Sequence, residues 1–336
     1  MTTYEDKVRR QIEQYRDLPI HDLPEIFHVW SHKYLRPLIE SVFARSSIAE
    51  IYADHIGQSF KRTGNHEAVS LGAGEASMEI DVAKHLLAAG EHDFRIHCFE
   101  LSDHLIGRGQ ANARAAGVQD HIVYNQADLN SWRPTSRYAA FMANHSLHHF
   151  VELETIFSLV ADAMEPEGRF ITNDMIGRNG HMRWPETRTI VDYFWRQLPE
   201  SFKYHHQLRR FEAPDFMDWD CSGEGFEGIR AQDILPLLIR HFGFTHFAAW
   251  GGAIDIFIDR GFGHNYSKNN PEHIAFIDTL ETVNSAMLAI GFIKPTQMLA
   301  VTTLDKDAPC ITHNGMTPAK AMRDPTVPYE FMAPKS

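Results

Sequence analysis

Three histidines within five residues, His145, His148 and His149, are the clearest candidates for chemistry in this 336-residue chain. The segment N-H-S-L-H-H-F, residues 144–150, directly follows an apolar stretch of strand type. Neutral imidazole near pH 7 can take a proton from a hydroxyl group. We expect His148 or His149, ahead of His145, to act as a general base. The alternative is that these histidines bond to the backbone at the start of a helix.

The same histidines raise the question of a metal site. His145 and His149 have the one-turn spacing of a zinc pair. A third ligand would come from His181, His205 or His206. No cysteine cluster and no H-E-x-x-H motif accompanies them, so the sequence predicts no metal.

A second group of chemically capable side chains lies between residues 176 and 230. Guanidinium groups recognise carboxylates in bidentate fashion, and aromatic rings form apolar walls. We expect this segment to be a lid that binds an anionic acceptor, although surface ion pairs are an equally simple role for each arginine. The predicted substrate-binding residues are Arg178, His181, Arg183, Trp184, Tyr193 and Arg230.

These groups need elements that position them, and the central one runs from residue 66 to residue 83. Residues 68–71 predict a short buried strand, and Gly72-Ala73-Gly74 ends it. An apolar pattern of helical type then begins at Met78. A strand, a glycine turn and a helix present backbone N–H groups to nucleotide-like ligands in open α/β sheets.

Three further strands are predicted after this turn. Residues 94–99 form the second strand, and Glu100 at its end can accept hydrogen bonds from both hydroxyls of a ribose. A helix over residues 103–116, ended by Gly117, leads to a third strand at 121–124 and to Asp128. The fourth strand, residues 138–143, opens into the histidine run.

At this point the chain resembles the class I S-adenosylmethionine-dependent methyltransferases of small-molecule type. The resemblance rests on the blocks V-S-L-G-A-G-E-A-S, C-F-E-L-S, N-Q-A-D-L and A-N-H-S-L-H-H-F, and on M-E-P-E-G-R-F-I as the turn into a fifth strand. It covers about a third of the chain, residues 67–174. It implies S-adenosylmethionine as the cofactor, with contacts to Gly72, Ala73, Gly74, Glu100, Leu101, Asp128, Leu129 and Asn144.

Two positions depart from the pattern of the resembled family. Ser70 stands where an acidic residue is frequent, and Ala76 stands where a third glycine is frequent. The acidic contact to the methionine ammonium would then come from Glu75 or Glu79.

The predicted architecture follows from the resemblance. It is an α/β fold with a Rossmann-like seven-stranded sheet of order 3-2-1-4-5-7-6, in which the last strand, 297–304, is antiparallel beside the fifth. We expect a helical N-terminal cap at 1–60, which covers the cofactor or forms a homodimer contact. The core would comprise 61–175 and 229–304, with an insertion at about 258–295. A substrate lid would occupy 176–228 and a C-terminal arm 305–336.

Composition narrows the possible partners. A net charge of −12 argues against a nucleic-acid substrate, which requires clustered Lys and Arg. Three scattered cysteines fit a reducing compartment. No apolar run approaches the roughly 18 residues of a membrane span, and the first residues have no signal-peptide character. The chain is therefore expected to be cytoplasmic, without membrane or nucleic-acid partners.

The function predicted from the sequence is methylation of a small molecule, with O-methylation of a hydroxyl or carboxylate in specialised metabolism preferred over N- or C-methylation. Two alternatives stay open. A nicotinamide-dependent oxidoreductase would also use a glycine turn and Glu100, although no Tyr-x-x-x-Lys pair is present. A non-catalytic cofactor-binding subunit is the other.

Overall fold

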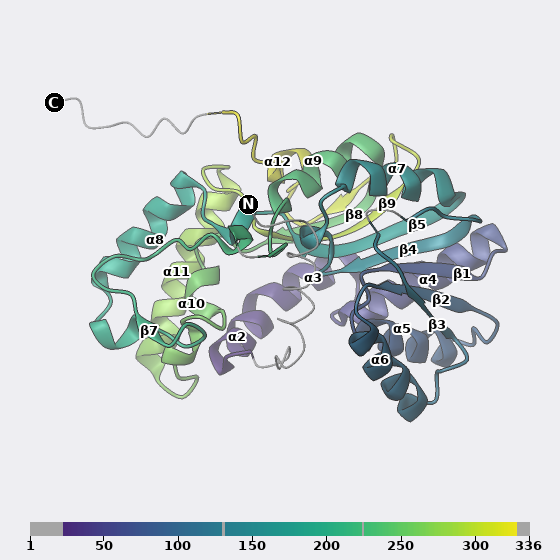
Figure 1. Cartoon of the computed structure of the whole chain (residues 1–336). Helices are drawn as coiled ribbons and strands as arrows, with labels where there is room; N and C mark the ends of the chain where they lie inside the picture. The colour runs from purple at the N-terminus through teal and green to yellow at the C-terminus, as the bar shows by residue number, and fades with distance from the viewer. Residues whose placement is uncertain (1–22, 130–131, 224, 328–336) are drawn as a thin grey trace.

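A mostly parallel sheet forms the centre of the molecule (Figure 1). The computed structural model describes residues 23–129, 132–223 and 225–327. The first 22 residues of the predicted N-terminal cap lie outside the described residues, as does the end of the predicted C-terminal arm. Within the described chain, no helix combines the length and the apolar character needed to cross a membrane.

The sheet has eight strands in the order β3-β2-β1-β4-β5-β9-β8-β10. The first five strands are parallel, and β9 lies antiparallel between β5 and β8. A separate hairpin pairs β6 with β7. The strands are β1 (Glu67–Leu71), β2 (Arg95–Glu100), β3 (Ile122–Gln126), β4 (Tyr138–Asn144), β5 (Met164–Met175), β6 (Tyr204–His205), β7 (Arg210–Phe211), β8 (Gly243–Trp250), β9 (Gln297–Thr303) and β10 (Ile311–Thr312).

The α/β Rossmann-like class is confirmed, but the stated seven-stranded sheet is wrong because an eighth strand extends it. Ile311 and Thr312 of β10 pair in parallel with His246 and Phe247 at the edge of β8. The segment after Asp305 is therefore not only an arm. The free edge of β8 offers backbone N–H and C=O groups, and the chain returns to use them.

Helices cover both faces of this sheet. Those before and between the strands are α2 (Glu25–Trp30), η1 (Ser31–Leu35), α3 (Arg36–Phe43), α4 (Ile48–Thr63), α5 (Ser77–Ala88), α6 (Asp103–Ala116), η2 (Leu147–His149) and α7 (Leu153–Ala163). Those that follow are η3 (Asn179–His181), α8 (Pro185–Gln197), η4 (Glu200–Phe202), η5 (Cys221–Gly223), α9 (Ala231–His241), α10 (Asp255–Ile258), η6 (Gly263–Asn265), α11 (Pro271–Ala289) and α12 (Pro318–Ala321).

Local signals in the sequence explain where several helices begin and end. The hydroxyl of Ser102 caps α6 by accepting a hydrogen bond from the N–H of Leu105 at 3.3 Å. Gly117, with φ of 72°, ends the same helix in the left-handed conformation, as predicted. Pro37 lies in the first turn of α3, where a missing N–H breaks no helical bond. A single π-helical turn, η1, joins α2 to α3.

Alternate residues of each strand face opposite sides, and each side has its own core. On one side Ala68, Ile96 and Met142 pack with α3, α4, α5 and α6. On the other side Val69 and Phe141 pack with α7 and α9. Both layers are visible above and below the sheet in Figure 1. The sheet is thus buried on both faces, which leaves its edges and strand ends for function.

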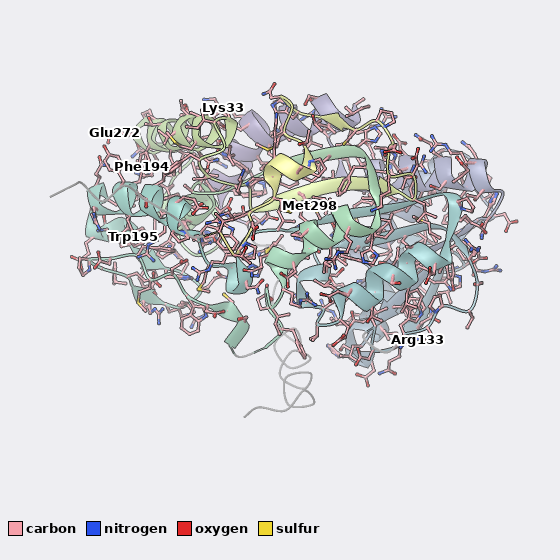
Figure 2. The ribbon with its side chains drawn as sticks, turned by 90° about the horizontal axis from the view of Figure 1, so that it is seen from above. Lys33, Arg133, Phe194, Trp195, Glu272 and Met298 are labelled. Atoms are coloured by element: carbon pink, nitrogen blue, oxygen red, sulfur yellow. The ribbon has the colours of Figure 1, made fainter. Side chains whose placement is uncertain are left out.

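A third cluster lies beside the sheet and joins segments that are far apart in the chain. It contains apolar residues of α2, α8, α10 and α11. The indole N–H of Trp30 on α2 donates to the buried carboxylate of Glu281 on α11 at 2.7 Å. Figure 2 shows Phe194 and Trp195 of α8 on the same side of the molecule as Glu272 of α11, well away from Met298 in the sheet. The N-terminal helix, the predicted lid and the predicted second insertion therefore share one core.

Candidate active site

The carboxyl ends of four neighbouring parallel strands bring the predicted residues to one edge of the sheet. Leu71 pairs with Phe99, and Glu100 pairs with Gln126. Asn144 pairs with Asn173 on β5. The glycine turn after β1, the acidic end of β2, the segment after β3 and the histidine run after β4 therefore open toward the same side, where α/β sheets bind ligands.

The glycine turn has the backbone geometry that its residue types predict. Gly72 has φ of 75°, a left-handed conformation that favours glycine. A Cβ on Gly72 would meet the Cβ of Ser146 at 2.9 Å. The N–H groups of Gly72 and Ala73 both donate to the carbonyl of Phe99 at 3.0 Å, which ties the turn to β2.

Glu100 holds the other side of this turn. Its carboxylate accepts hydrogen bonds from the N–H of Gly74 at 2.9 Å and from the N–H of Ser102 at 2.8 Å. Gly74 has φ of 56°, and a Cβ there would meet nothing within 4 Å, so open space lies beside it. The carbonyl of Leu101 accepts from the amide of Gln126 at 3.3 Å.

Further along the same edge, the two residues predicted beside an adenine differ in exposure. Asp128 is partly exposed, whereas Leu129 is buried in the core beneath the edge. The structure therefore leaves Asp128 accessible at the end of β3 and uses much of Leu129 for packing.

Glu79, one of the two acidic residues considered for the ammonium contact, is buried beside Ser70. The hydroxyl of Ser70 donates to Oε1 of Glu79 at 2.5 Å. Oε2 of Glu79 is buried without a hydrogen-bond partner among the described residues. Burial raises the pKa of Glu79 to about 7. Glu75 instead forms an ion pair with Arg108.

His145 and Asn144 lie at the open end of β4. The amide of Asn173 donates to Oδ1 of Asn144 at 3.0 Å and contacts Nε2 of His145 at 3.2 Å. His145 is exposed and has φ of 50°, an unusual backbone conformation for a residue with a side chain. The other two histidines of the run lie on the next turn, η2, where His148 is buried.

His148 is the buried member of the run, and Asp174 fixes its ring. Nδ1 of His148 lies 2.6 Å from Oδ1 of Asp174. The other carboxylate oxygen of Asp174 accepts from the N–H groups of Ser146 and Leu147 at 2.9 and 2.8 Å. Asp174 is fully buried, and these donors compensate for the loss of water around its charge.

The second nitrogen of His148 faces a carboxylate that no motif indicated. Oε1 of Glu227 lies 3.5 Å from Nε2 of His148 and 2.7 Å from Nε2 of His181. Oε2 of Glu227 lies 3.8 Å from Nδ1 of His149. Two of the predicted catalytic histidines and one predicted substrate-binding histidine therefore surround Glu227.

The pKa values reflect this arrangement of charges. Burial by itself lowers the pKa of His148, but the carboxylates of Asp174 and Glu227 outweigh it and raise the pKa to about 10. Burial by itself raises the pKa of Glu227, but hydrogen bonds from His148 and His181 outweigh burial and bring the pKa well below its usual range. Burial and the neighbouring His148 lower the pKa of His149 to about 3. The neutral imidazole expected at His148 is therefore not its state in the protein without ligands, whereas His149 is neutral.

The three predicted arginines have different surroundings. Arg230 donates to both oxygens of Glu154 at 2.6 and 2.7 Å and to Asp233 at 2.8 Å. Arg183 forms an ion pair with Asp218 at 3.4 Å. Within the described chain, no carboxylate forms an ion pair with Arg178. Of these three arginines, only Arg178 has no carboxylate partner among the described residues.

The two predicted aromatic residues of the lid also differ. The ring of Trp184 is buried, and the guanidinium of Arg178 lies over it at 5.9 Å. Tyr193 is 64% exposed on the outer side of α8. The structure thus groups Arg178 with Trp184 and leaves Tyr193 facing solvent.

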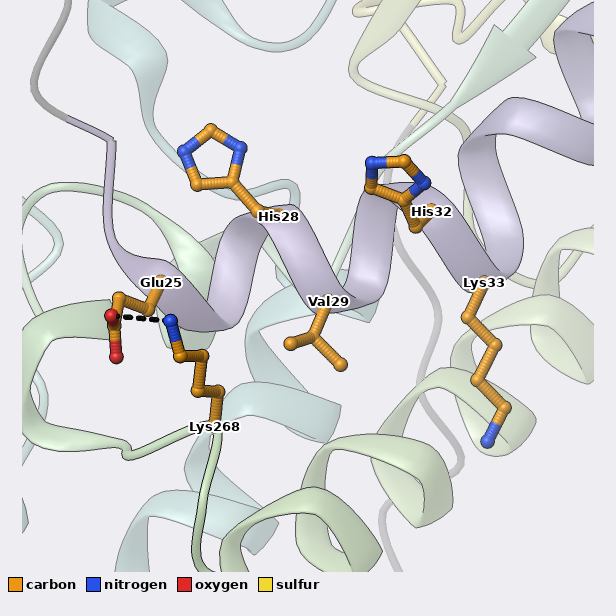
Figure 3. Close-up of a pocket in the computed structure, with 6 residues that line it drawn as sticks. All are labelled: Glu25, His28, Val29, His32, Lys33 and Lys268. Carbon is orange, nitrogen blue, oxygen red and sulfur yellow. Dashed lines mark ion pairs between the residues drawn. The ribbon is translucent and has the colours of Figure 1, made fainter.

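A surface hollow of about 560 Å³ lies elsewhere, on α2. Glu25 and Lys268 form an ion pair across it at 2.7 Å (Figure 3). Its other lining residues are His28, Val29, His32 and Lys33. None of them belongs to the strand-end site, and its exposed ion pair has the character of an ordinary surface contact.

Asp174 and Glu227 are residues of the candidate site to which the sequence analysis assigned no role. A signal for Asp174 was present, because it lies at the carboxyl end of the fifth strand and neighbouring parallel strands end at the same edge. Glu227 lies in the glycine-rich segment G-F-E-G, which has no helical or strand period. Only the folded chain brings it to His148.

No family model and no curated protein matches this chain. Solved structures do. The geranyl diphosphate C-methyltransferase from Streptomyces coelicolor is 14% identical, with a TM-score of 0.42 over 76% of this chain and 78% of that one. The O-methyltransferase of a Brevibacillus brevis trans-AT polyketide synthase is 13% identical, with a TM-score of 0.42 over 86% and 82%. A putative sarcosine dimethylglycine methyltransferase from Galdieria sulphuraria is 13% identical, with a TM-score of 0.42 over 90% and 99%.

Proposed function

We propose that this protein is an S-adenosylmethionine-dependent methyltransferase that acts on a small-molecule acceptor, with O-methylation of a hydroxyl or carboxylate. The observation that carries the proposal is the pair of carboxylates, Glu79 and Glu100, on either side of an open glycine turn. A ligand with an ammonium group at one end and ribose hydroxyls at the other fits this pair. When bound, S-adenosylmethionine supplies a methyl group activated by its sulfonium.

The residues around the turn suit this cofactor. Oε2 of Glu79 is a buried oxygen without a hydrogen-bond partner in the described chain, and an ammonium group would satisfy it. The carboxylate of Glu100 is already aligned by two backbone N–H groups and keeps lone pairs for hydroxyl donors. The space beside Gly74 allows close approach of a ligand to the backbone.

The acceptor would bind on the side of the histidines. Ser146 contacts Gly72 and begins the turn that carries His148, so the glycine turn and the histidines share one wall. Arg178 supplies a cation without a carboxylate partner among the described residues, which favours an anionic acceptor. Methyl transfer is an in-line substitution, so these groups contribute mainly by aligning the acceptor and excluding water. A hydroxyl acceptor must also lose its proton, whereas a carboxylate need not.

Calorimetric titration of the full chain with S-adenosylmethionine, and separately with S-adenosylhomocysteine, tests the cofactor. We expect dissociation constants on the order of micromolar for both. NAD serves as the control ligand and should not bind. Binding of NAD alone would replace this proposal with the oxidoreductase alternative. Transfer of labelled methyl to carboxylic acid and hydroxyl acceptors then separates an enzyme from a non-catalytic binding subunit.

A further inference from the structure

Three side chains from distant parts of the chain point their donor atoms at one place. One nitrogen of His148, one nitrogen of His181 and one oxygen of Glu227 all lie within 4.8 Å of one another. They come from η2, from η3 and from the loop before α9. His148 is 4% exposed at its side chain, and His181 and Glu227 are 20% and 23% exposed. The group is therefore closed on one side and reachable from the other.

Backbone hydrogen bonds hold these three segments together. The N–H of Gly180 donates to the carbonyl of Gly228 at 2.9 Å, and the N–H of Ile229 donates to the carbonyl of His148 at 3.1 Å. A Cβ on Gly228 would meet the ring of His181 at 2.9 Å, so the absence of a side chain there lets the ring approach. His181 itself has φ of 55°. Such a conformation is costly for a residue with a side chain and is typical of functional sites.

Asp174 orients the first of these imidazoles. Its carboxylate bonds Nδ1 of His148 and is held in turn by the backbone N–H groups of Ser146, Leu147 and Met175. A metal ion that displaces the proton of Nε2 would leave the hydrogen on Nδ1, beside Asp174, and the lone pair of Nε2 directed at the group of donors. Histidine ligands of metal ions commonly donate their other ring N–H to a carboxylate in this way.

A general base would need a different arrangement. The free nitrogen of a base must face the hydroxyl that it deprotonates. Nε2 of His148 faces Oε1 of Glu227 instead, and a second imidazole, that of His181, contacts the same oxygen. Two imidazoles and one carboxylate that converge on one point match the ligands of catalytic zinc and of non-haem iron sites, which keep open positions.

We propose that His148, His181 and Glu227 bind one divalent transition-metal ion of the Zn²⁺ type, and that its open position takes an oxygen of the acceptor. The ligand set favours Zn²⁺, Co²⁺ or Fe²⁺ over Mg²⁺ and Ca²⁺, which prefer oxygen ligands. This differs from the expectation of no metal in the sequence analysis, where the pair considered was His145 with His149.

The role of the metal rests on the proposed function, whereas its binding does not. A hydroxyl bound to such an ion loses its proton to solvent near neutral pH. The resulting oxygen forms a bond to the methyl carbon while the carbon–sulfur bond breaks, and the electron pair of that bond goes to sulfur. Charges balance, because a sulfonium and an alkoxide give a thioether and an ether.

The test begins with full-length protein that has been treated with a chelator to remove bound metal. The protein is titrated with Co²⁺, and binding is monitored by visible absorption. The affinity for Zn²⁺ is measured separately, in competition with a chromophoric chelator. We expect one tight site per chain. Glu227→Gln and His181→Gln should each weaken binding at least about 100-fold. His104→Gln, which removes an exposed histidine on α6, is the matched control and should leave the site unchanged.

Asp174→Asn adds a finer readout, because its amide oxygen can still accept from the N–H groups of Ser146 and Leu147, whereas the charge beside Nδ1 of His148 is lost. A loss of about 10- to 100-fold in metal affinity is expected. The metal proposal is wrong if the protein without substitution binds Co²⁺ only as weakly as isolated surface histidines do. It is also wrong if Glu227→Gln and His181→Gln retain the tight site. Because these measurements need no S-adenosylmethionine, they can succeed where the cofactor titration fails, and the reverse.

Discussion

The hydroxyl of Ser146 donates a hydrogen bond to the carbonyl oxygen of Leu71 at 2.6 Å, so the last residue of β1 is bonded to the start of the histidine turn. The adjacent Gly72 has no Cβ, and Ser146 occupies the space that a Cβ would need. The proposed cofactor turn and the proposed acceptor site are thereby built on one contact. A change at this contact should affect both.

Gly72→Ala tests that contact, with Gly74→Ala as its matched control. Both glycines have positive φ, so alanine costs about 1 kcal/mol of backbone strain at either position. Only at position 72 does the new Cβ meet another atom within 3 Å. We expect Gly72→Ala to lower the free energy of unfolding by about 2–3 kcal/mol and Gly74→Ala by about 1 kcal/mol in urea titrations. Equal losses in the free energy of unfolding would show that Ser146 moves to accommodate the new Cβ without further destabilisation.

Glu100→Gln should weaken binding of S-adenosylmethionine by a factor of about 10 or more. The amide keeps the shape of the side chain but loses the charge that strengthens hydrogen bonds from ribose hydroxyls. Asp103→Asn, an exposed acidic residue of α6 in the same region, is the control and should leave the affinity unchanged. Calorimetric titration of both variants with S-adenosylmethionine measures the two affinities. Unchanged affinity in Glu100→Gln would mean that the end of β2 does not bind the ribose.

The strand ends were predictable because each apolar run is bounded by residues that end it. Gly72 follows β1 directly, Glu100 is the last residue of β2, and Asp128 lies just beyond the end of β3. Neighbouring parallel strands end at one edge of the sheet. The same logic extends to Asp174, which could have been assigned from its place at the carboxyl end of β5. The signal was local in every case.

The rest depended on tertiary packing, which no period in the sequence encodes. Phe194 and Trp195 are buried on α8, but the cluster that they share with residues of α2 and α11 joins segments that are far apart in the chain. Glu227 reaches His148 only because Gly228 and Ile229 bond to other segments through their backbone. Glycine-rich stretches carry little hydrophobic pattern, so a functional carboxylate within one is hard to recognise.

Glu79→Gln should separate cofactor binding from stability. A folded-state pKa raised from 4.5 to about 7 means that Glu79 favours the fold below pH 4.5 and that this contribution is lost as pH rises through 7. At pH 8 the buried charge is therefore a cost of about 1–3 kcal/mol. The neutral amide avoids this cost and can still accept the hydrogen bond from Ser70. We expect the ligand-free variant to be more stable at pH 8 and to bind S-adenosylmethionine more weakly.

Unfolding curves at pH 5 and pH 8, together with calorimetry, provide both readouts for Glu79. Glu40→Gln, on the exposed side of α3, is the control and should change stability by no more than about 0.5 kcal/mol. A variant that binds the cofactor normally would remove Glu79 from the ammonium site, whatever its stability.

Arg178 and Arg230 should respond differently to the same substitution. Arg178→Gln removes the cation that has no carboxylate partner in the described chain, so we expect the KM of an anionic acceptor to rise about tenfold. Arg230→Gln breaks the bonds to Glu154 and Asp233 and should lower stability by about 1 kcal/mol while leaving KM unchanged. Steady-state kinetics and unfolding curves measure the two effects. A rise in KM only in Arg230→Gln would reverse the assignment.

His55 on α4 gives a test of acid stability that is independent of the active site. Its ring packs against those of Phe43 and His246, and burial, followed by the nearby His246, lowers its pKa to about 3. The unfolded chain binds a proton at pH 6.5 and the folded chain does not, so stability falls as pH decreases from 6.5 toward 3. Between pH 8 and pH 5 the protonation of His55 alone should lower the free energy of unfolding by about 2 kcal/mol.

His55→Phe should remove most of that loss, with some remaining from His246, whose pKa is also lowered. Urea unfolding at both pH values measures the difference, with His104→Gln as the exposed control. Equal pH dependence in His55→Phe and in the unsubstituted chain would mean that protonation of His55 does not drive the acid loss of stability.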